Sequence, residues 1–343
     1  MASSVRQRRD VSERSSRVIA PVHVGLGVLL LAAIAVPPAF GSYYMYLVSL
    51  CLVNIIVAVG LNLLTGNAGQ ISVCHSSFVA IGAYGTTYLV TKLGLSFWVA
   101  LPLGGLIAAL FGLALGFPAL RLRGFYLAVV TLGFLEMSTL LIRELPMITG
   151  GVRGMSAPRP VLFGHALTSD LAFYYVILVI TLVTIWCAFS LLHSPTGRAF
   201  GAIRNSEAVA QTLAVPLARA KLIAFMISAF FAGIGGALFA SLVGFIDPTE
   251  FELWTSVRYI IIVVVGGLGS IAGSVVGALV LTVLPEVLRD FKEYNELVFG
   301  TLVLVALMVF PQGLVSLVPM LRARLARGAR AKPIGDKHRT ESP

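Results

Sequence analysis

Residues 61–75, LNLLTGNAGQISVCH, place a group of Asn, Gly, Gln, Ser and His residues between two strongly apolar runs. The runs over 43–64 and 71–91 are each long enough to cross a bilayer as a helix, at a rise of about 1.5 Å per residue. Polar groups at that depth need hydrogen-bond partners or a water-filled cavity. The stretch therefore predicts a polar site between two membrane-spanning helices.

The overall composition indicates a membrane protein. Of the 343 residues, 58% are hydrophobic and 12% are charged, against roughly a quarter charged in an ordinary globular domain. The apolar residues come in windows of about 20, which predicts an all-α, polytopic membrane helix bundle in contact with lipid. The net charge of +10 is concentrated at the two ends and in one central loop, so a compact basic domain for nucleic acid is excluded. The three cysteines lack the spacing of metal ligands.

Basic residues orient the predicted spans, because Lys and Arg are retained in cytoplasmic loops. With both termini inside, 18 of the 25 Lys and Arg residues fall on the cytoplasmic side. The prediction is a basic cytoplasmic tail over 1–21, a transmembrane domain over 22–318 and a second basic cytoplasmic tail over 319–343. Within the domain, the apolar windows are 22–40, 43–64, 71–91, 98–118, 125–142, 171–192, 221–243, 256–283 and 297–318.

One of these windows conflicts with the predicted orientation. Nine simple spans would leave the basic tail over 319–343 outside. The conflict disappears if 256–283 forms two short halves, 256–265 and 271–283, with Gly-Gly-Leu-Gly-Ser at 266–270 between them. We therefore expect about ten membrane segments, of which two form a discontinuous short pair. Glycines repeated at four-residue spacing, at 269, 273 and 277 and at 112 and 116, predict close helix packing.

Two interrupted elements, 65–70 and 266–270, point to a translocation pathway. Ser72, His75 and Ser76 are expected to share one face of the helix that starts there, with Asn54 and Asn62 pointing into the same region. The alternative is that these groups only bond neighbouring helices to each other. The candidate pathway residues are Asn62, Gly66, Asn67, Gly69, Gln70, Ser72, His75, Gly266, Gly267 and Gly269.

Titratable groups are scarce in the predicted spans, where Glu136 is the one carboxylate well inside. Ion-driven carriers usually embed several acids, so an ion-coupled secondary transporter is the alternative rather than the leading hypothesis. A Gly-Lys-Ser/Thr phosphate loop is also absent from the sequence. We therefore expect the energy to come from another chain, and we expect no enzyme activity, cofactor or metal in this one.

The segment 193–221 is the longest polar cytoplasmic loop between spans. Residues 197–213 are expected to form a short amphipathic helix, which Ala214-Val215-Pro216 should end. Such a helix suits docking onto a cytoplasmic partner, and a merely interfacial helix is the alternative. The candidate coupling residues, with Ile203 as the apolar anchor and Glu207 as a charge at the rim, are Arg198, Phe200, Ile203, Arg204 and Glu207.

Five ordered blocks of sequence are similar to one known family. They are GLNLLTGNAGQISVCHSSFVAIGAY, LRLRGFYLAVVTLGFLEM, TGGVRG, GRAFGAIRNSEAVAQTLAV and VVVGGLGSIAGSVVGALVL. In this order they resemble blocks of the branched-chain amino acid ABC-transporter permease family, specifically its LivM-type subunit, over roughly 43–318. The resemblance implies pathway lining for the polar stretch at 61–75.

The resemblance also implies partners and a location. A related second permease subunit, two cytoplasmic ATP-binding subunits and a periplasmic substrate-binding protein would assemble with this chain in a bacterial inner membrane. The loop over 193–221 would be the coupling segment, with Glu207-Ala208 at the family's Glu-Ala-Ala-like signature. Two residues depart from that pattern: Val209 follows Glu207-Ala208, and Ala214 stands where the family usually has Gly. Leucine-like amino acids are the family's default substrate, while urea, amides and other small polar solutes stay open.

Overall fold

A computed structural model of the protein describes residues 41–122, 124–162, 165–166 and 169–288, with eight isolated positions between 298 and 314. The predicted tails over 1–21 and 319–343 and the predicted span 22–40 lie outside the described residues. So does most of the window 297–318.

The described chain is helical, as predicted. Five helices are long and apolar enough to cross a membrane, among them α2 in continuation with η2, and α11 and α12 are shorter apolar helices. The helices are α2 (Ser42–Leu61), η2 (Asn62–Asn67), α3 (His75–Thr91), α4 (Phe97–Ala119), α5 (Phe125–Glu144), α6 (Pro146–Thr149), η3 (Gly151–Arg153), α7 (Asp170–His193), α8 (Pro195–Asn205), α9 (Glu207–Thr212), α10 (Leu217–Val243), η4 (Pro248–Phe251), α11 (Leu253–Gly266) and α12 (Ile271–Val287). Two short antiparallel pairs join β1 (Met155–Ser156) to β4 (Phe245–Ile246), and β2 (Val161–Leu162) to β3 (His165–Ala166).

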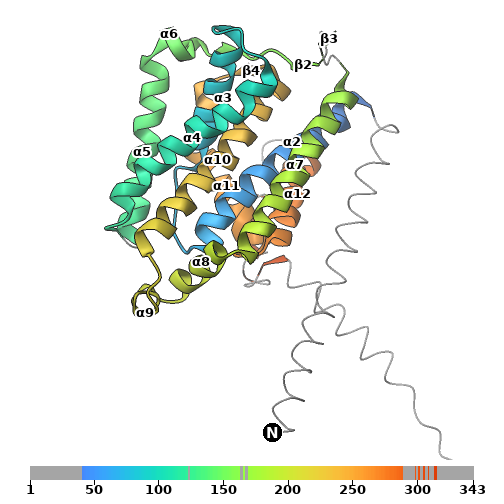
Figure 1. The fold of residues 1–343 in the computed structure, drawn as a ribbon. Helices are drawn as coiled ribbons and strands as arrows, with labels where there is room; N and C mark the ends of the chain where they lie inside the picture. Colours follow the sequence, from blue (N-terminus) through green and yellow to red (C-terminus); the bar gives the residue numbers. More distant parts are fainter. Residues whose placement is uncertain are drawn as a thin grey trace, which may run out of the picture.

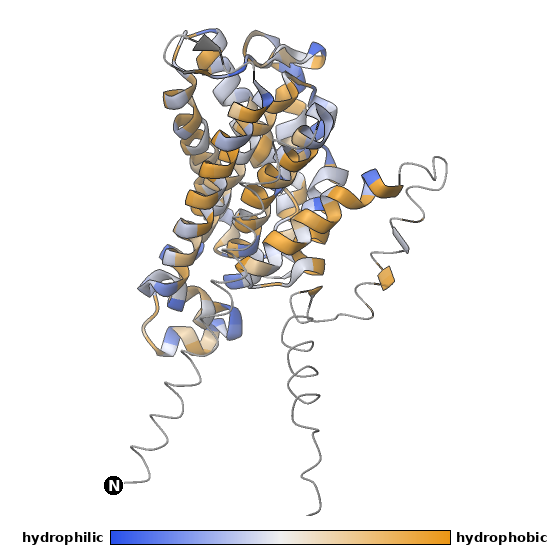
Figure 2. Ribbon diagram, turned by 90° about the vertical axis from the view of Figure 1, so that its right-hand side faces the viewer, coloured by the Kyte–Doolittle hydropathy of each residue, from blue (hydrophilic) through white to orange (hydrophobic). Residues whose placement is uncertain are grey.

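The segments that connect the long helices lie at two opposite ends of the bundle (Figure 1). Helices α8 and α9 lie at one end, whereas α6 and the short strands lie at the other. Figure 2 shows hydrophobic residues along the helices and hydrophilic ones gathered toward the two ends. Below, the end with α8 and α9 is called the inner end and the opposite end is called the outer end.

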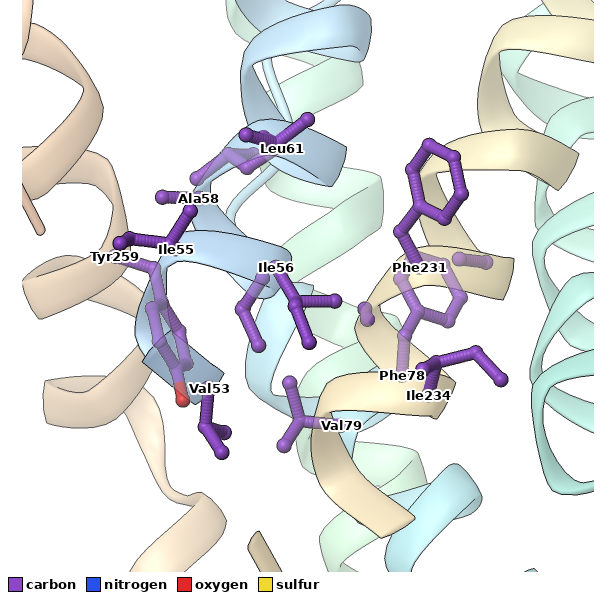
Figure 3. Close-up of a cluster of buried hydrophobic side chains, with 14 of the residues drawn as sticks. Val53, Ile55, Ile56, Ala58, Leu61, Phe78, Val79, Phe231, Ile234 and Tyr259 are labelled. Atoms are coloured by element: carbon purple, nitrogen blue, oxygen red, sulfur yellow. The ribbon is translucent and has the colours of Figure 1, made fainter. Parts of the chain in front are cut away.

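Helix α10 packs against α2, α3 and α4, and α2 also contacts α7, α11 and α12. Figure 3 shows the apolar cluster at this junction, where Ile56, Phe78 and Phe231 meet. Glycines let the helices approach: a Cβ added at Gly82 would meet the backbone of Gly233, and one at Gly112 would meet Ala229. Since lipid supplies no hydrophobic driving force between helices, this close packing holds the bundle together.

The two predicted interruptions differ in where the structure places them. The predicted break at 266–270 is confirmed, because α11 ends at Gly266 and α12 begins at Ile271. The predicted interruption at 65–70 is displaced: the helix continues as a π-helical turn to Asn67, and the non-helical stretch covers 68–74. Helix α3 therefore starts at His75 rather than at residue 71.

Candidate functional site

Asn62 joins the two interrupted elements at the inner end. Its Nδ2 donates to the Ser270 carbonyl at 2.8 Å and to Ser274 Oγ at 2.7 Å, and its Oδ1 accepts from the Gly269 amide at 2.8 Å. Asn67 Nδ2 adds a bond to the Gly269 carbonyl at 3.2 Å. The Asn62 side chain is only 2% exposed, so its bonds are made in the protein interior. This group is called the inner crossing, and its residues are Asn62, Gly66, Asn67, Gly269, Ser270 and Ser274.

Glycine is required at this crossing for two reasons. A Cβ at Gly66 would meet Asn62 Oδ1 and the Gly269 amide nitrogen. Gly267 and Gly269 have φ values of 130° and 83°, in the region that L side chains rarely adopt. The crossing is therefore a tight, sequence-specific contact of two backbones.

Close packing also joins the helices on either side of the break. A Cβ at Gly266 would meet the Gly273 carbonyl, and one at Gly277 would meet the Ile262 carbonyl. The predicted close packing by Gly273 and Gly277 is thereby confirmed. Gly269 differs from the prediction, because it lies in the turn against Gly66 and Arg204 rather than on that helical stripe.

The other predicted pathway residues follow along the non-helical stretch 68–74. Gly69 has a φ of 69°, and Gln70 is 4% exposed with its Nε2 donating to the Ala68 carbonyl at 3.3 Å. Gln70 Oε1 is buried and has no hydrogen-bond partner in the described part of the chain. Ser72 is also buried, and its Oγ lies 3.5 Å from Cys74 Sγ. Since Ser72 precedes the helix, it does not share a helical face with His75, contrary to the prediction.

His75 lies apart from the inner crossing, at the first residue of α3. It is fully buried, and its Nε2 lies 3.2 Å from the carbonyl of Val57, which precedes Asn62 by five residues on α2. The neighbouring Ser76 bonds to Ser256 of α11, through both its amide (2.9 Å) and its hydroxyl (2.8 Å). His75 and Ser76 thus connect the start of α3 to α2 and α11.

A second polar contact lies on the same pair of helices, nearer the outer end. Asn54 Nδ2 of α2 donates to Thr282 Oγ1 of α12 at 2.9 Å. Eight residues separate Asn54 from Asn62, and eight separate Thr282 from Ser274, as expected for antiparallel helices. The two contacts are therefore about 12 Å apart along the helix axis.

The cytoplasmic loop predicted as one helix over 197–213 forms two helices, α8 and α9. Ser206 separates them because it adopts an extended conformation (φ −166°) and its hydroxyl caps α9, accepting from the Val209 amide at 3.4 Å. The predicted end before Pro216 is confirmed, since α9 stops at Thr212. Ala214 then has a φ of 56°, the one positive value at a non-glycine residue in the described chain.

Helix α8 packs inward, onto the body of its own chain. Phe200 and Ile203 are 0% and 3% exposed, so they hold α8 in place and do not offer a surface anchor. Arg204 reaches both interrupted elements: a Cβ at Gly69 would lie 3.2 Å from Arg204 Cα, and one at Gly269 would meet the Arg204 guanidinium. The loop is thus in direct contact with the inner crossing.

Glu207 is also not the charge at the rim that the sequence suggested. Its carboxylate forms a 2.7 Å ion pair with Lys221 Nζ, and the two side chains are 14% and 3% exposed. The exposed apolar residues of α9 and the turn after it are Val209 (57%) and Leu213 (69%). They were not among the predicted coupling residues, although the unusual Val209 was a usable signal. Arg198 is exposed and donates weakly to the His193 carbonyl at 3.4 Å.

The described residues contain no group of three or more His, Cys, Asp and Glu side chains that could hold a metal ion. The polar contacts of the candidate site join neighbouring helices to one another.

Comparisons with known proteins agree with a transport role. A sequence model described as branched-chain amino acid transport system / permease component matches residues 43–310. The high-affinity branched-chain amino acid transport system permease protein LivM of Escherichia coli (strain K12) is 38% identical over 324 residues, covering 88% of this chain and 76% of LivM. LivH of the same strain is 23% identical, covering 76% of this chain and 90% of LivH. The fructose import permease protein FruG of Bifidobacterium longum is 28% identical over 40% of this chain and 43% of its own length. No solved structure matches.

Proposed function

The chain belongs to the branched-chain amino acid transport permease family, and from that premise we propose that it forms half of the translocation pathway of an ATP-driven importer. It is a multi-pass transport permease and not an enzyme. Its substrate is a branched-chain amino acid, by analogy with LivM and LivH. FruG, named for fructose, marks the limit of that analogy, because it matches a much smaller part of the chain.

The assembly we propose contains a related second permease subunit, two cytoplasmic ATP-binding subunits and a periplasmic substrate-binding protein. ATP is bound by the partner subunits, and this chain carries no cofactor. The similarity to both LivM and LivH supports a partner built on the same fold. The complex lies in a bacterial inner membrane, with about ten membrane segments in this chain and both of its termini in the cytoplasm.

The inner crossing is the gate in this proposal, and α8 and α9 are the coupling element. Asn62 holds the two interrupted elements together with three short hydrogen bonds. Arg204 of α8 lies against Gly69 and Gly269, one residue on each element. A movement of α8 imposed by an ATPase therefore acts directly on the crossing. This contact is the observation that carries the proposal.

The ATPase docks on α9, through Val209 and Leu213. Both are exposed, and other residues of the same loop, Glu207 and Gln211, help to line a cavity of about 340 Å³. Apolar anchors at the centre of an interface usually carry most of its binding energy. Phe200 and Ile203 keep a coupling role through packing, because they attach α8 to the transmembrane body.

The test is ATP-driven leucine uptake by the complete complex in proteoliposomes. Val209→Asp should lose co-purification of the ATPase and lose uptake, because it places a charge in a desolvated contact. Val152→Asp is the matched control, since Val152 is 75% exposed at the outer end and should tolerate the change. Retention of both ATPase and uptake by Val209→Asp would reject α9 as the docking surface.

The alternative, an ion-coupled secondary transporter, makes a different prediction in the same assay. Uptake would then proceed without the ATPase subunits and would stop when the ion gradient is dissipated. Ion-driven transporters usually have a chain of acids within their membrane-spanning helices. Among the described residues, Glu136 is the carboxylate in the middle of such a helix, α5, which favours the ATP-driven mechanism.

A further inference from the structure

A cavity of about 540 Å³ lies near the outer end, between α2, α10, η4, α11 and α12. It is called the outer cavity. Small-molecule sites usually measure about 300–1,000 Å³, so a free amino acid fits within it. Asn54 and Thr282, the outer polar contact between α2 and α12, lie in its wall. The outer cavity therefore adjoins the interface that leads to the inner crossing.

The outer cavity contains two opposite charges that do not pair with each other. Glu250 of η4 and Arg258 of α11 both line it. Within the part of the chain that the structure describes, Glu250 Oε2 is buried and has no hydrogen-bond partner, whereas Arg258 is exposed and makes no hydrogen bond or ion pair. A buried polar atom without a partner is costly and is normally satisfied by a donor. In the outer cavity, a bound ligand can supply that donor to Glu250.

The remaining wall of the outer cavity is largely apolar and aromatic. Leu47 and Leu50 of α2, Phe239 of α10 and Leu281 of α12 contribute to it. This wall suits an aliphatic side chain. A neutral sugar or a simple anion would offer no cationic donor to the buried Glu250 Oε2, and a simple cation would leave the exposed guanidinium of Arg258 to solvent. A molecule with an ammonium, a carboxylate and an apolar side chain satisfies all three features.

We propose that the outer cavity binds a free zwitterionic amino acid, with Glu250 accepting from its ammonium group and Arg258 donating to its carboxylate. The aliphatic side chain lies against the leucines and Phe239. This inference rests on the proposed function and adds to it a site in the permease itself. The permease then selects its substrate by charge, in addition to any selection by the substrate-binding protein.

The test uses the complex of permease and ATPase subunits in lipid nanodiscs, without the substrate-binding protein and without ATP. Binding of radiolabelled leucine is measured at equilibrium, with two competitors that each lack one charge: 3-methylbutylamine and 4-methylpentanoate. In the wild type, both competitors should bind about tenfold or more weakly than leucine, as for the loss of one charged hydrogen bond. Equal competition by all three would overturn the proposal without any variant.

The variants separate the two charges. Arg258→Gln should weaken leucine about tenfold or more and leave the amine unchanged, whereas Glu250→Gln should weaken leucine and leave the carboxylate analogue unchanged. Glu144→Gln is the matched control: Glu144 is an exposed carboxylate of α5 outside this cavity, and leucine binding by this variant should stay within about threefold of the wild type. Unchanged leucine binding in Arg258→Gln or Glu250→Gln, or an equal loss in Glu144→Gln, would contradict the assignment. If the wild-type complex drives uptake but fails these binding tests, the proposed function stands and this site is rejected.

Discussion

The inner crossing and the outer cavity both include residues of α12 and of the continuous helix formed by α2 and η2, but their polar groups are bonded differently. At the inner crossing, both polar atoms of the Asn62 amide are bonded, and two glycines, Gly66 and Gly269, bring the backbones together. In the outer cavity, Glu250 Oε2 is buried without a partner, and the exposed Arg258 is unpaired among the described residues. Since a buried polar atom is costly when unsatisfied, the bonded Asn62 favours a closed crossing, and Glu250 favours a ligand that donates to it.

Charge pairing extends this contrast to the coupling loop. At the inner end, Glu207 and Lys221 form a buried ion pair, whereas Glu250 and Arg258 at the outer end stay separate. Other charges at the outer end are paired, as Arg143 is with Glu252 at 2.7 Å, so Glu250 and Arg258 differ from their surroundings there.

The largest expected effect follows from breaking the inner ion pair. Glu207→Ala leaves the 3% exposed Lys221 without its partner, which should cost about 3–5 kcal/mol of folding stability. The measurement is thermal unfolding in detergent, with Glu144→Ala, an exposed carboxylate of α5, as control. The double variant Glu207→Ala with Lys221→Met should recover most of the loss. A Glu207→Ala protein as stable as the Glu144→Ala protein would mean that this pair contributes little to stability.

The second effect concerns the glycines of the inner crossing. Gly66→Ala drives a methyl group into Asn62 Oδ1 and the Gly269 amide, which should destabilise the crossing by about 2–4 kcal/mol and abolish uptake. Gly133→Ala of α5 is the control, because a Cβ there meets nothing within 4 Å. The measurement is leucine uptake by both variants in the same membranes. Normal transport by Gly66→Ala would mean that the contact is not tight in the working protein.

The third effect sharpens the description of the outer cavity through pH. Burial, and the nearby charge of Asp247, raise the pKa of the Glu250 carboxyl above its usual value of 4.5. Above that raised pKa, Glu250 is ionised and can accept a hydrogen bond from an ammonium group. As the pH falls below this pKa, leucine binding should weaken by about tenfold per unit of pH. Arg258 and Glu286 also face this cavity, together with Tyr46 and Tyr259.

The matching control for the pH profile is Glu250→Gln. Its leucine affinity should be low and nearly independent of pH, since the titrating group is gone. Asp247 does not produce the same profile, because hydrogen bonds from Thr249 hold its pKa below the usual value. An identical pH profile in the wild type and Glu250→Gln would assign the titration to another group.

The smallest effect is expected at Ala214, where the coupling loop turns into α10. Its φ of 56° costs an alanine about 1–2 kcal/mol, and glycine would relieve that strain while adding freedom to the unfolded chain. Ala214→Gly should therefore raise stability by about 0.5 kcal/mol and leave uptake unchanged. The same thermal unfolding assay measures it, and a loss of stability would show that the turn is not strained.

Much of the fold was predictable from sequence because bilayer-length apolar windows and glycines carry it. The break at 266–270 followed from the charge of the C-terminal tail and the glycine pattern, and α11 and α12 end and begin there. The displaced break at 68–74 was not predictable. The π-helical turn through Asn67 depends on the bonds that Asn62 and Asn67 make to Gly269, which lies 207 and 202 positions away along the chain.

The contacts among the candidate site residues could not be predicted from the sequence. Asn62, Gly66 and Gly269 were named from local sequence, yet only the packed helices place them together. The amphipathic pattern of the coupling loop indicated apolar residues correctly, but it could not say that Phe200 and Ile203 face the chain's own interior. Glu250 and Arg258, which we propose as ligands, were not named from sequence because each comes from a different element and neither stands in a motif.

The central claim is that the inner crossing is a gate that opens during transport. Ser274→Cys tests it most directly, because Ser274 is fully buried beside Asn62, and serine and cysteine are similar in size. The measurement is the rate of alkylation by a membrane-impermeant maleimide added to the cytoplasmic side, in a Cys187→Ser background, with and without ATP. Thr282→Cys, at the outer contact, is the control. We predict that Ser274→Cys reacts in one nucleotide state and is protected in the other, while Thr282→Cys stays unreactive from that side. Protection of Ser274→Cys in every state, in a complex that still transports, would contradict the gate and leave the crossing as a permanent clamp between helices.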